Sequence, residues 1–177
     1  SKKYKLFLLP VELSFRHYQW AIYLTYMITY GCFGLMAGSI FPSLLRLADQ
    51  VNRDVDSVSF FFTAKGIGAI VGASISGALL DNFNKKIQIL LYAVVFGMAS
   101  CVVIFAYLSN FTVLMLFASI YGIFTSLETS FINTLVLWLW QDRVATFLLG
   151  LHLCFGIGAF SSAFIAAYSI STFNSTK

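Results

Sequence analysis

The sequence predicts an all-α protein, a polytopic bundle of transmembrane helices. Of its 177 residues, 59% are hydrophobic and 10% are charged, whereas charged residues make up about 25% of an ordinary soluble domain. The mean hydropathy is +0.85. Five long apolar runs alternate with short polar turns, and each run has close to or more than the roughly 20 residues that cross a bilayer. No low-complexity linker divides the chain, so we expect one membrane domain.

Residues 1–17 precede the first apolar run. They begin with basic residues and continue into a short apolar stretch that Pro10 and Glu12 interrupt. A secretory signal peptide has a longer uninterrupted apolar centre, followed by a small-residue cleavage site. We therefore expect this segment to lie at the membrane interface as a short amphipathic lead-in.

The apolar runs are expected to form five helices that lie antiparallel to their neighbours in sequence. Only two residues separate the third run from the fourth, and only the turn of residues 141–143 separates the fourth from the fifth. The fourth run is long enough to require tilt. The expected helices cover residues 18–45, 58–80, 87–108, 111–140 and 144–170 of a bundle spanning 18–170, and residues 171–177 form a C-terminal tail.

The second run carries two stripes of small residues at the four-residue spacing of a helix face. One stripe is Gly68, Gly72 and Ser76, and the other is Ala69, Ala73 and Gly77. Small residues let helix backbones approach closely in a membrane. We therefore expect other helices to pack on both faces, and we expect the glycines of GIGAIVG here and of GIGAF in the fifth run to serve packing.

Basic residues predict which end of the bundle faces the cytoplasm. The net charge is +4, from 11 basic and 7 acidic residues. In a membrane protein such an excess indicates orientation, because basic residues gather on the cytoplasmic side, so no nucleic-acid partner is expected. A cytoplasmic, or matrix, N-terminus places seven basic residues inside and four outside. The inner set is Lys2, Lys3, Lys5, Arg16, Lys85, Lys86 and Arg143, and the outer set is Arg46, Arg53, Lys65 and Lys177. The plasma membrane and organellar membranes, including the mitochondrial inner membrane, fit equally.

The sequence contains no pattern typical of catalysis or of metal binding. It has no Ser, His and Asp set, no zinc spacing and no phosphate-binding glycine loop after a strand. Its two histidines, His17 and His152, are far apart. Cys32, Cys101 and Cys154 lie inside apolar runs without paired spacing, as small packing residues do. We therefore expect no enzyme activity, no cofactor and no metal.

The turn after the second run resembles a signature of the major facilitator superfamily. That signature joins helices two and three and reads Gly, three residues, an acid, a base, one residue, Gly, one residue and bases. Gly77, Asp81, Lys85 and Lys86 match it, and Asn82 and Asn84 depart from it. Asn replaces Gly readily where the backbone turns left-handed, whereas Asn82 removes one partner of a charge relay. In a complete transporter such a gating loop latches one state of the cycle; in a fragment it would only hold helices together.

The fourth and fifth runs resemble the sugar-transporting branch of this superfamily, which contains bacterial fucose:proton symporters and animal sodium-dependent glucose transporter-like proteins. The resemblance lies in GIFTSLET (122–129) and GLHLCFGIGA (150–159) and covers roughly residues 18–170. It implies that Glu128 takes part in substrate binding and coupling. It also implies that His152 lies close to a sugar-contacting position.

Two departures from this branch bear on function. The symporters have an acid four residues before the proline of the first helix, and here Gly38 stands before Pro42, so symporter-type proton coupling is not expected. The superfamily builds twelve helices in two halves that rock around a midplane site, whereas five helices of the N-terminal half are matched here. The resemblance therefore implies a partial module that lacks the opposite wall of its site.

Two functions follow from these observations. The first is a transport module of major-facilitator type for a sugar-like solute, held in the lipid bilayer and completed by helices from the same protein or from a partner. The second is a non-transporting accessory or structural subunit of a large membrane complex, derived from such a transporter. The open small-residue stripes favour the second, because they invite other membrane proteins to cover them.

Glu128 is the only acid deep inside an apolar run. A charged side chain at the centre of the membrane costs about 2.5–3.5 kcal/mol on insertion scales, so we expect it to face the bundle interior. It is either a substrate or coupling site or a structural acid bonded to a neighbouring helix. Thr125, Thr129 and Asn133 accompany it at helical spacing and either contact a sugar or bond helices together.

Other side chains in the runs have two interpretations each. His152 either packs between helices or contacts the sugar. Lys65 either reaches the membrane interface along its apolar stem or contacts an anion. Tyr23, Tyr26 and Tyr30 lie on one face of the first run and either anchor the helix at the interface or stack on a sugar.

Overall fold

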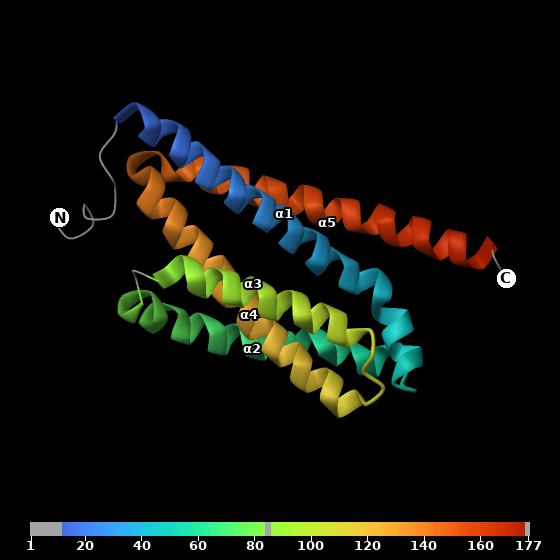
Figure 1. Cartoon of the computed structure of the whole chain (residues 1–177). Coiled ribbons are helices and arrows are strands. Elements are labelled where there is room, and N and C mark those ends of the chain that lie inside the picture. The colour runs from blue at the N-terminus through green and yellow to red at the C-terminus, as the bar shows by residue number, and fades with distance from the viewer. Residues whose placement is uncertain (1–11, 84–85, 176–177) are drawn as a thin grey trace.

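The computed structural model describes residues 12–83 and 86–175, which form helices joined by short turns (Figure 1). No strand occurs among these described residues, so the predicted all-α class is confirmed. The helices are α1 (Glu12–Gln50), α2 (Val55–Asn82), α3 (Ile87–Phe105), α4 (Phe111–Trp140), the short 3-10 helix η2 (Gln141–Arg143) and α5 (Val144–Ser175).

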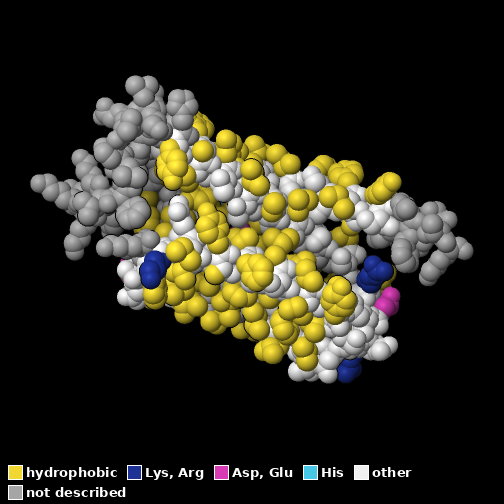
Figure 2. Space-filling view, viewed as in Figure 1, with side chains coloured by type: hydrophobic (Ala, Val, Ile, Leu, Met, Phe, Trp, Pro, Cys, Tyr) yellow, Lys and Arg dark blue, Asp and Glu magenta, His cyan; other side chains and the backbone are white. Residues whose placement is uncertain are grey.

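The lengths and apolar character of these helices are those of an integral, multi-pass membrane protein. Four described stretches are long and apolar enough to cross a membrane, namely Tyr18–Gln50, Val55–Asn82, Ile87–Phe105 and Phe111–Ala166. The last has 56 residues and contains α4, η2 and most of α5; the chain reverses direction at η2 (Figure 1). Hydrophobic side chains cover most of the face seen in Figure 2, and charged side chains lie towards its ends.

Polar residues in the turns begin and end the helices. Asp54 caps α2, because its carboxylate accepts hydrogen bonds from the amide of Ser57 at 3.2 Å and from the Ser57 hydroxyl at 2.7 Å. Asn110 caps α4 in the same way and accepts from the amide of Thr112 at 2.9 Å. Gln141 ends α4 in a left-handed conformation, with φ 42°. These caps satisfy amides that have no partner inside a helix.

Some helix boundaries differ from those predicted. Residues 1–11 of the expected interfacial segment lie outside the described residues, and residues 12–17 belong to α1. Residues 171–175 of the expected tail belong to α5. Helix α3 ends at Phe105, before residue 108, because the amides of Ala106 and Tyr107 turn back onto the carbonyls of the last helical turn.

Helix α2 packs along α4 through one of its two small-residue stripes. Gly68, Gly72 and Ser76 are buried. A Cβ atom added at Gly68 would overlap the carbonyl of Ser119, and one added at Gly72 would lie 2.6 Å from the carbonyl oxygen of Ile123. The other stripe is different: Ala73 and Gly77 are exposed, and a Cβ at Gly77 would meet nothing within 4 Å. The prediction that both stripes receive neighbouring helices is therefore wrong for Ala73 and Gly77 within the described chain, whereas Ala69 is half-buried with its amide 3.0 Å from a Cβ added at Gly122 of α4.

Helix α1 packs along α5 through a second glycine seam. A Cβ added at Gly34 would overlap the backbone of Phe155, and one added at Gly38 would lie 2.7 Å from the carbonyl oxygen of Ala159. From the other side, a Cβ at Gly158 would overlap the carbonyl of Gly31. Both long seams thus hold two helix backbones in direct contact.

The three cysteines do not share one environment. All are free thiols; Cys101 is buried, Cys154 is half-buried and Cys32 is exposed. The packing role predicted for all three therefore applies to Cys101 and not to Cys32.

The helix joints gather at two ends of the bundle (Figure 1). One end holds the beginning of α1, the α2–α3 joint and the α4–α5 joint, and the other holds the α1–α2 and α3–α4 joints and the end of α5. Lys86 and Arg143 therefore lie at the same end, as the predicted orientation requires, and Lys85 lies outside the described residues. The assignment of this end to the cytoplasm stays a prediction.

Candidate functional site

Glu128 lies on α4, the helix that packs against both α2 and α3. Its side chain is 0% exposed, and neither carboxylate oxygen has a hydrogen-bond partner within the described residues. Buried polar atoms nearly always have a partner, and ionisable groups inside a membrane usually mark a functional site. The expected inward orientation of Glu128 is observed, and the hydrogen bond to a neighbouring helix that a structural acid would make is absent from this part of the chain.

Tyr30 of α1 is the residue that reaches Glu128 from another helix. Its hydroxyl lies in the neighbourhood of Thr129 and Glu128 and does not hydrogen-bond the Glu128 carboxylate. The ring is 2% exposed. Tyr23 and Tyr26 on the same face of α1 are buried as well, so the interpretation of these three residues as interfacial anchors is wrong: the face is covered by α5, α4 and α3.

His152 of α5 lies next to Tyr30. The two ring centroids are 5.7 Å apart, and the planes meet at 68°. His152 is itself exposed. Tyr30 therefore stands between His152 on one side and the Thr129–Glu128 pair on the other, which brings together three of the residues predicted from the sequence.

The other polar residues of α4 bond mainly to their own helix. The hydroxyl of Thr125 donates to the carbonyl of Gly122 and that of Thr129 to the carbonyl of Thr125, both at 2.9 Å. Such bonds join turns of one helix and do not bond helices together. Asn133 is partly buried, and its Oδ1 has no partner among the described residues. The predicted polar stripe therefore holds two buried acceptors, the Glu128 carboxylate and Asn133 Oδ1, that have no hydrogen-bond partner in the described chain.

Lys65 and Tyr121 lie on facing helices at one depth. The Lys65 Nζ atom lies 5.4 Å from the centroid of the Tyr121 ring, within the range of a cation–π interaction. The Tyr121 hydroxyl is buried without a partner in the described chain and interacts electrostatically with Glu128. Lys65 thus lies over a ring inside the bundle, so the interfacial position predicted for it is not seen, and the anion contact stays a prediction.

The gating-loop residues form a separate group. Asp81 and Lys86 are exposed, Gly77 has open space around it, and Lys85 is not described. The amide of Lys86 donates to the carbonyl of Phe83 at 2.8 Å, which closes the turn between α2 and α3. This loop lies at the end of the bundle (Figure 1), away from the buried stretch of α4 that carries Glu128.

Comparison with known proteins identifies the family. The BT1 family model matches residues 40–149, more than half of the chain. The chain belongs to the BT1 family. No solved structure matches it.

Several curated relatives of this BT1-family chain are transporters by name. It is 30% identical over 142 residues to human sodium-dependent glucose transporter 1, and the match covers 77% of this chain and 26% of the human protein. It is 28% identical over 139 residues to mouse sodium-dependent glucose transporter 1A, and the match covers 78% of this chain and 32% of the mouse protein. It is 26% identical over 151 residues to major facilitator superfamily domain-containing protein 4A of Xenopus tropicalis, and the match covers 85% of this chain and 30% of the Xenopus protein.

These comparisons confirm the predicted resemblance to the major facilitator superfamily and to its sodium-dependent glucose transporter-like branch. The BT1-family chain spans between 26% and 32% of the length of these three relatives. It is a transporter-like membrane module.

Tyr121 of this BT1-family chain escaped prediction from sequence, and the surroundings of Tyr30, a candidate for sugar stacking, were not predicted. Tyr30 was visible as part of a tyrosine stripe, but nothing in the sequence indicated that α5 and α4 cover it. Tyr121 is one of nine tyrosines. The available signal was its position seven residues before Glu128, which places both side chains on one face of a helix.

Proposed function

We propose that this chain is part of a membrane transporter for a sugar-like small solute, completed by further helices from the same protein or from a partner chain. The main supporting observation is that Glu128 is fully buried without a hydrogen-bond partner among the described residues, in a chain whose relatives are named as glucose transporters. An unsatisfied buried polar group costs about 1–3 kcal/mol. A solute that donates hydroxyl groups to Glu128 and Asn133 would remove that cost.

The other residues have distinct roles in this proposal. Glu128 binds the solute and couples its movement, and Asn133 offers a second acceptor. Thr129 and Tyr30 orient the carboxylate side of the site, and His152 bounds it through the Tyr30 ring. Thr125 keeps the local turn of α4 closed through its bond to Gly122.

Uptake of radiolabelled glucose by the full protein in proteoliposomes tests this role. Glu128→Gln keeps the shape of the side chain and removes its charge. A hydrogen bond to a charged group contributes about 1.5–3 kcal/mol, so uptake should fall by about tenfold or more. The matched control is Asp142→Asn, an exposed acid of η2, which should leave uptake unchanged. Equal uptake by wild type and Glu128→Gln would remove the coupling role.

The loop between α2 and α3 is proposed to act as the gating latch of such a transporter. Gly77 and Asp81 would supply the close approach and the acid, and Lys85 and Lys86 would stay with anionic headgroups on the cytoplasmic or matrix side. Labelling of a cysteine introduced at Arg143 tests this orientation. Modification by an impermeant maleimide from the outside of intact cells would contradict it.

The alternative proposal is an accessory subunit of a larger membrane complex, such as one of the mitochondrial inner membrane. Its support is the surface of small residues left open on α2 and α5, where Cβ atoms at Gly66, Gly77 and Gly156 would meet nothing within 4 Å. Native mass spectrometry separates the two proposals. Stoichiometric recovery with a multisubunit complex, together with no saturable glucose uptake, would favour the accessory role over transport.

A further inference from the structure

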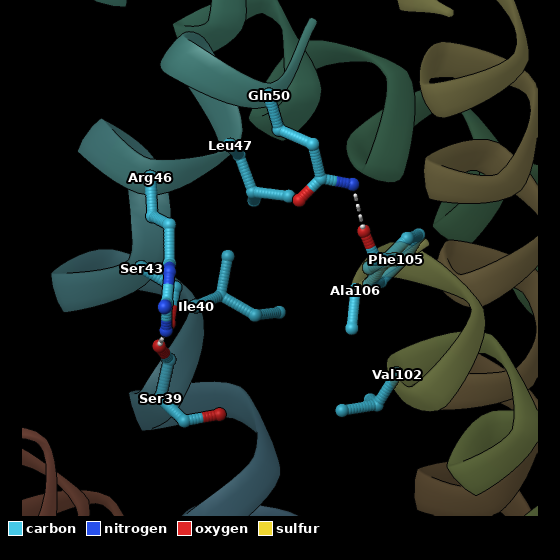
Figure 3. A pocket seen from close by; sticks show the side chains of 9 residues that line it. All are labelled: Ser39, Ile40, Ser43, Arg46, Leu47, Gln50, Val102, Phe105 and Ala106. Atoms are coloured by element: carbon cyan, nitrogen blue, oxygen red, sulfur yellow. Dashed lines mark hydrogen bonds between the residues drawn. The ribbon is translucent and has the colours of Figure 1, made fainter. Parts of the chain in front are cut away.

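A cavity of about 190 Å³ lies between α1 and α3, away from the Glu128 site. Figure 3 shows its two walls. The α3 wall is apolar. The α1 wall carries four polar side chains spaced four, three and four residues apart, which places them on one helix face. The α1 residues are Ser39, Ser43, Arg46 and Gln50, with Ile40 and Leu47 beside them, and the α3 side supplies Val102, Phe105 and Ala106.

Three oxygen atoms on the α1 wall are acceptors. The hydroxyl of Ser39 donates its hydrogen to the carbonyl of Met36, and that of Ser43 donates to the carbonyl of Ser39, both at 2.8 Å. Each hydroxyl therefore offers only lone pairs to a ligand. The Gln50 amide nitrogen donates to the carbonyls of Phe105, at 3.2 Å, and Leu108. Its Oε1 is left as an acceptor.

Arg46 supplies the donors of this cavity. A guanidinium has five N–H groups in a fixed plane, so it serves a ligand in addition to partners within the protein. The cationic residue Arg46 and the three residues that carry these acceptor oxygens thus line the same small cavity.

This inventory discriminates between classes of ligand. An anion would meet three acceptor oxygens and the negative ends of two helix dipoles, since α1 and α3 both end here. A metal cation would meet the Arg46 charge. A neutral polyol satisfies both kinds of group, because each of its hydroxyls donates to one atom and accepts from another. The Phe105 side chain adds an apolar wall for the C–H face of a sugar ring.

We propose that this cavity binds one monosaccharide ring, either as a free sugar or as the headgroup of a glycolipid. The volume of about 190 Å³ is below the roughly 300–1,000 Å³ of pockets for drug-sized ligands, and suits a single ring. The site is distinct from Glu128 and lies at the end of the bundle that holds the α3–α4 joint (Figure 1).

Binding of tritiated glucose to the full protein in glycolipid-free nanodiscs tests the free-sugar source. Retention of glucosylceramide during purification, read by native mass spectrometry, tests the glycolipid source. Ser43→Ala removes one acceptor, and Ala106→Phe fills the cavity from an exposed position. The matched control is Ser100→Ala: this half-buried serine makes the same bond to the carbonyl four residues earlier, at 2.8 Å, outside the cavity.

The proposal expects Ala106→Phe to abolish one class of bound sugar and Ser43→Ala to weaken it by about fivefold to tenfold, as expected for one lost hydrogen bond. Ser100→Ala should bind as wild type does. Loss in the glucose assay assigns a free sugar, and loss only in the glucosylceramide assay assigns a glycolipid. Equal binding by all variants in both assays would overturn the proposal, as would binding of inorganic phosphate that depends on Arg46.

This outcome is independent of the proposed transport function. Glu128→Gln and Asn133→Leu act on the central site. If these two variants abolish sugar binding and Ala106→Phe does not, the sugar binds at the central site. If Ala106→Phe abolishes sugar binding and the two central-site variants do not, the sugar binds in the cavity. Each site is thereby open to failure while the other stands.

Discussion

The tetrapeptide Gly-Ile-Gly-Ala occurs twice, at residues 66–69 of α2 and 156–159 of α5, and in both copies its two glycines have opposite surroundings. Cβ atoms added at Gly66 and Gly156 would meet nothing within 4 Å, whereas those at Gly68 and Gly158 would overlap a carbonyl of the partner helix. Identical local sequence therefore does not decide the role of a glycine. The face that the partner helix covers decides it, because residues two apart point to different sides of a helix.

Substitution of the second glycine of each tetrapeptide, Gly68 or Gly158, should give the largest effect on stability. Gly68→Ala and Gly158→Ala place a methyl group against backbone that cannot rotate away. Overpacking of this kind costs about 1–3 kcal/mol or more. The free energy of unfolding in detergent micelles, followed by circular dichroism during titration with SDS, measures the loss. Wild-type stability in both variants would show that the seams are looser than described.

A polar clamp distinguishes the α1–α5 seam from the α2–α4 seam. The Tyr23 hydroxyl donates to the carbonyl of Phe147 at 2.8 Å, and Tyr23 is 4% exposed. Tyr23→Phe should lower the free energy of unfolding by about 0.5–1.5 kcal/mol, the usual contribution of one hydrogen bond. Tyr18→Phe, at an exposed position of the same helix, is the control and should change nothing.

Substitution of the first glycine of each tetrapeptide, Gly66 or Gly156, should change the free energy of unfolding in the opposite direction. Gly66→Ala and Gly156→Ala have open space for the methyl group, and both residues are helical without a positive φ. Alanine reduces the entropy of the unfolded chain, so each change should stabilise the protein by about 0.4–1 kcal/mol. The same SDS titration measures it. A loss of stability would mean that further helices, from the same protein or from a partner chain, pack on these faces.

The smallest effect concerns the beginning of α2. The hydrogen bonds from the hydroxyl and amide of Ser57 hold the pKa of Asp54 below its ordinary value. A lowered pKa in the folded state contributes stability above the unfolded value, near about 3.9, and this contribution is lost as pH falls through the folded pKa. Ser57→Ala should raise the pKa of Asp54 towards the ordinary value. Thermal unfolding of the wild type and of Ser57→Ala between about pH 5 and 3 should then show that the stability contributed by Asp54 is lost at a higher pH in the variant. Identical pH profiles of the two proteins would contradict the capping role of Asp54.

The arrangement of the chain could be predicted from sequence to a useful extent. Apolar runs and polar turns locate α2, α4 and η2 closely, because lipid and water select opposite residue types. The four-residue spacing of Gly68 and Gly72 correctly predicts close helix packing. Which of two adjacent stripes would be covered was not predictable, since that depends on the position of α4.

The site was predicted in part for a similar reason. Glu128 stands out because an acid in an apolar run is costly, and its burial follows from that cost. Tyr30 does not stand out, because a tyrosine in a membrane helix is more often an anchor. Only the packing of α1 against α5 and its approach to α4 bring Tyr30 between His152 and Thr129. Lys65 is a comparable case: its position over the Tyr121 ring depends on the close α2–α4 seam.

The position of the Tyr30 hydroxyl near Glu128 is a further feature on which the proposed transport site depends. A double-mutant cycle of Tyr30→Phe and Glu128→Gln, with glucose uptake by the full protein as the readout, tests it directly. Tyr30→Phe keeps the ring against His152 and removes the hydroxyl. If the two side chains act together, the double variant transports no more slowly than Glu128→Gln alone, a coupling of about 0.5–3 kcal/mol. Losses that multiply, as for two independent residues, would contradict it.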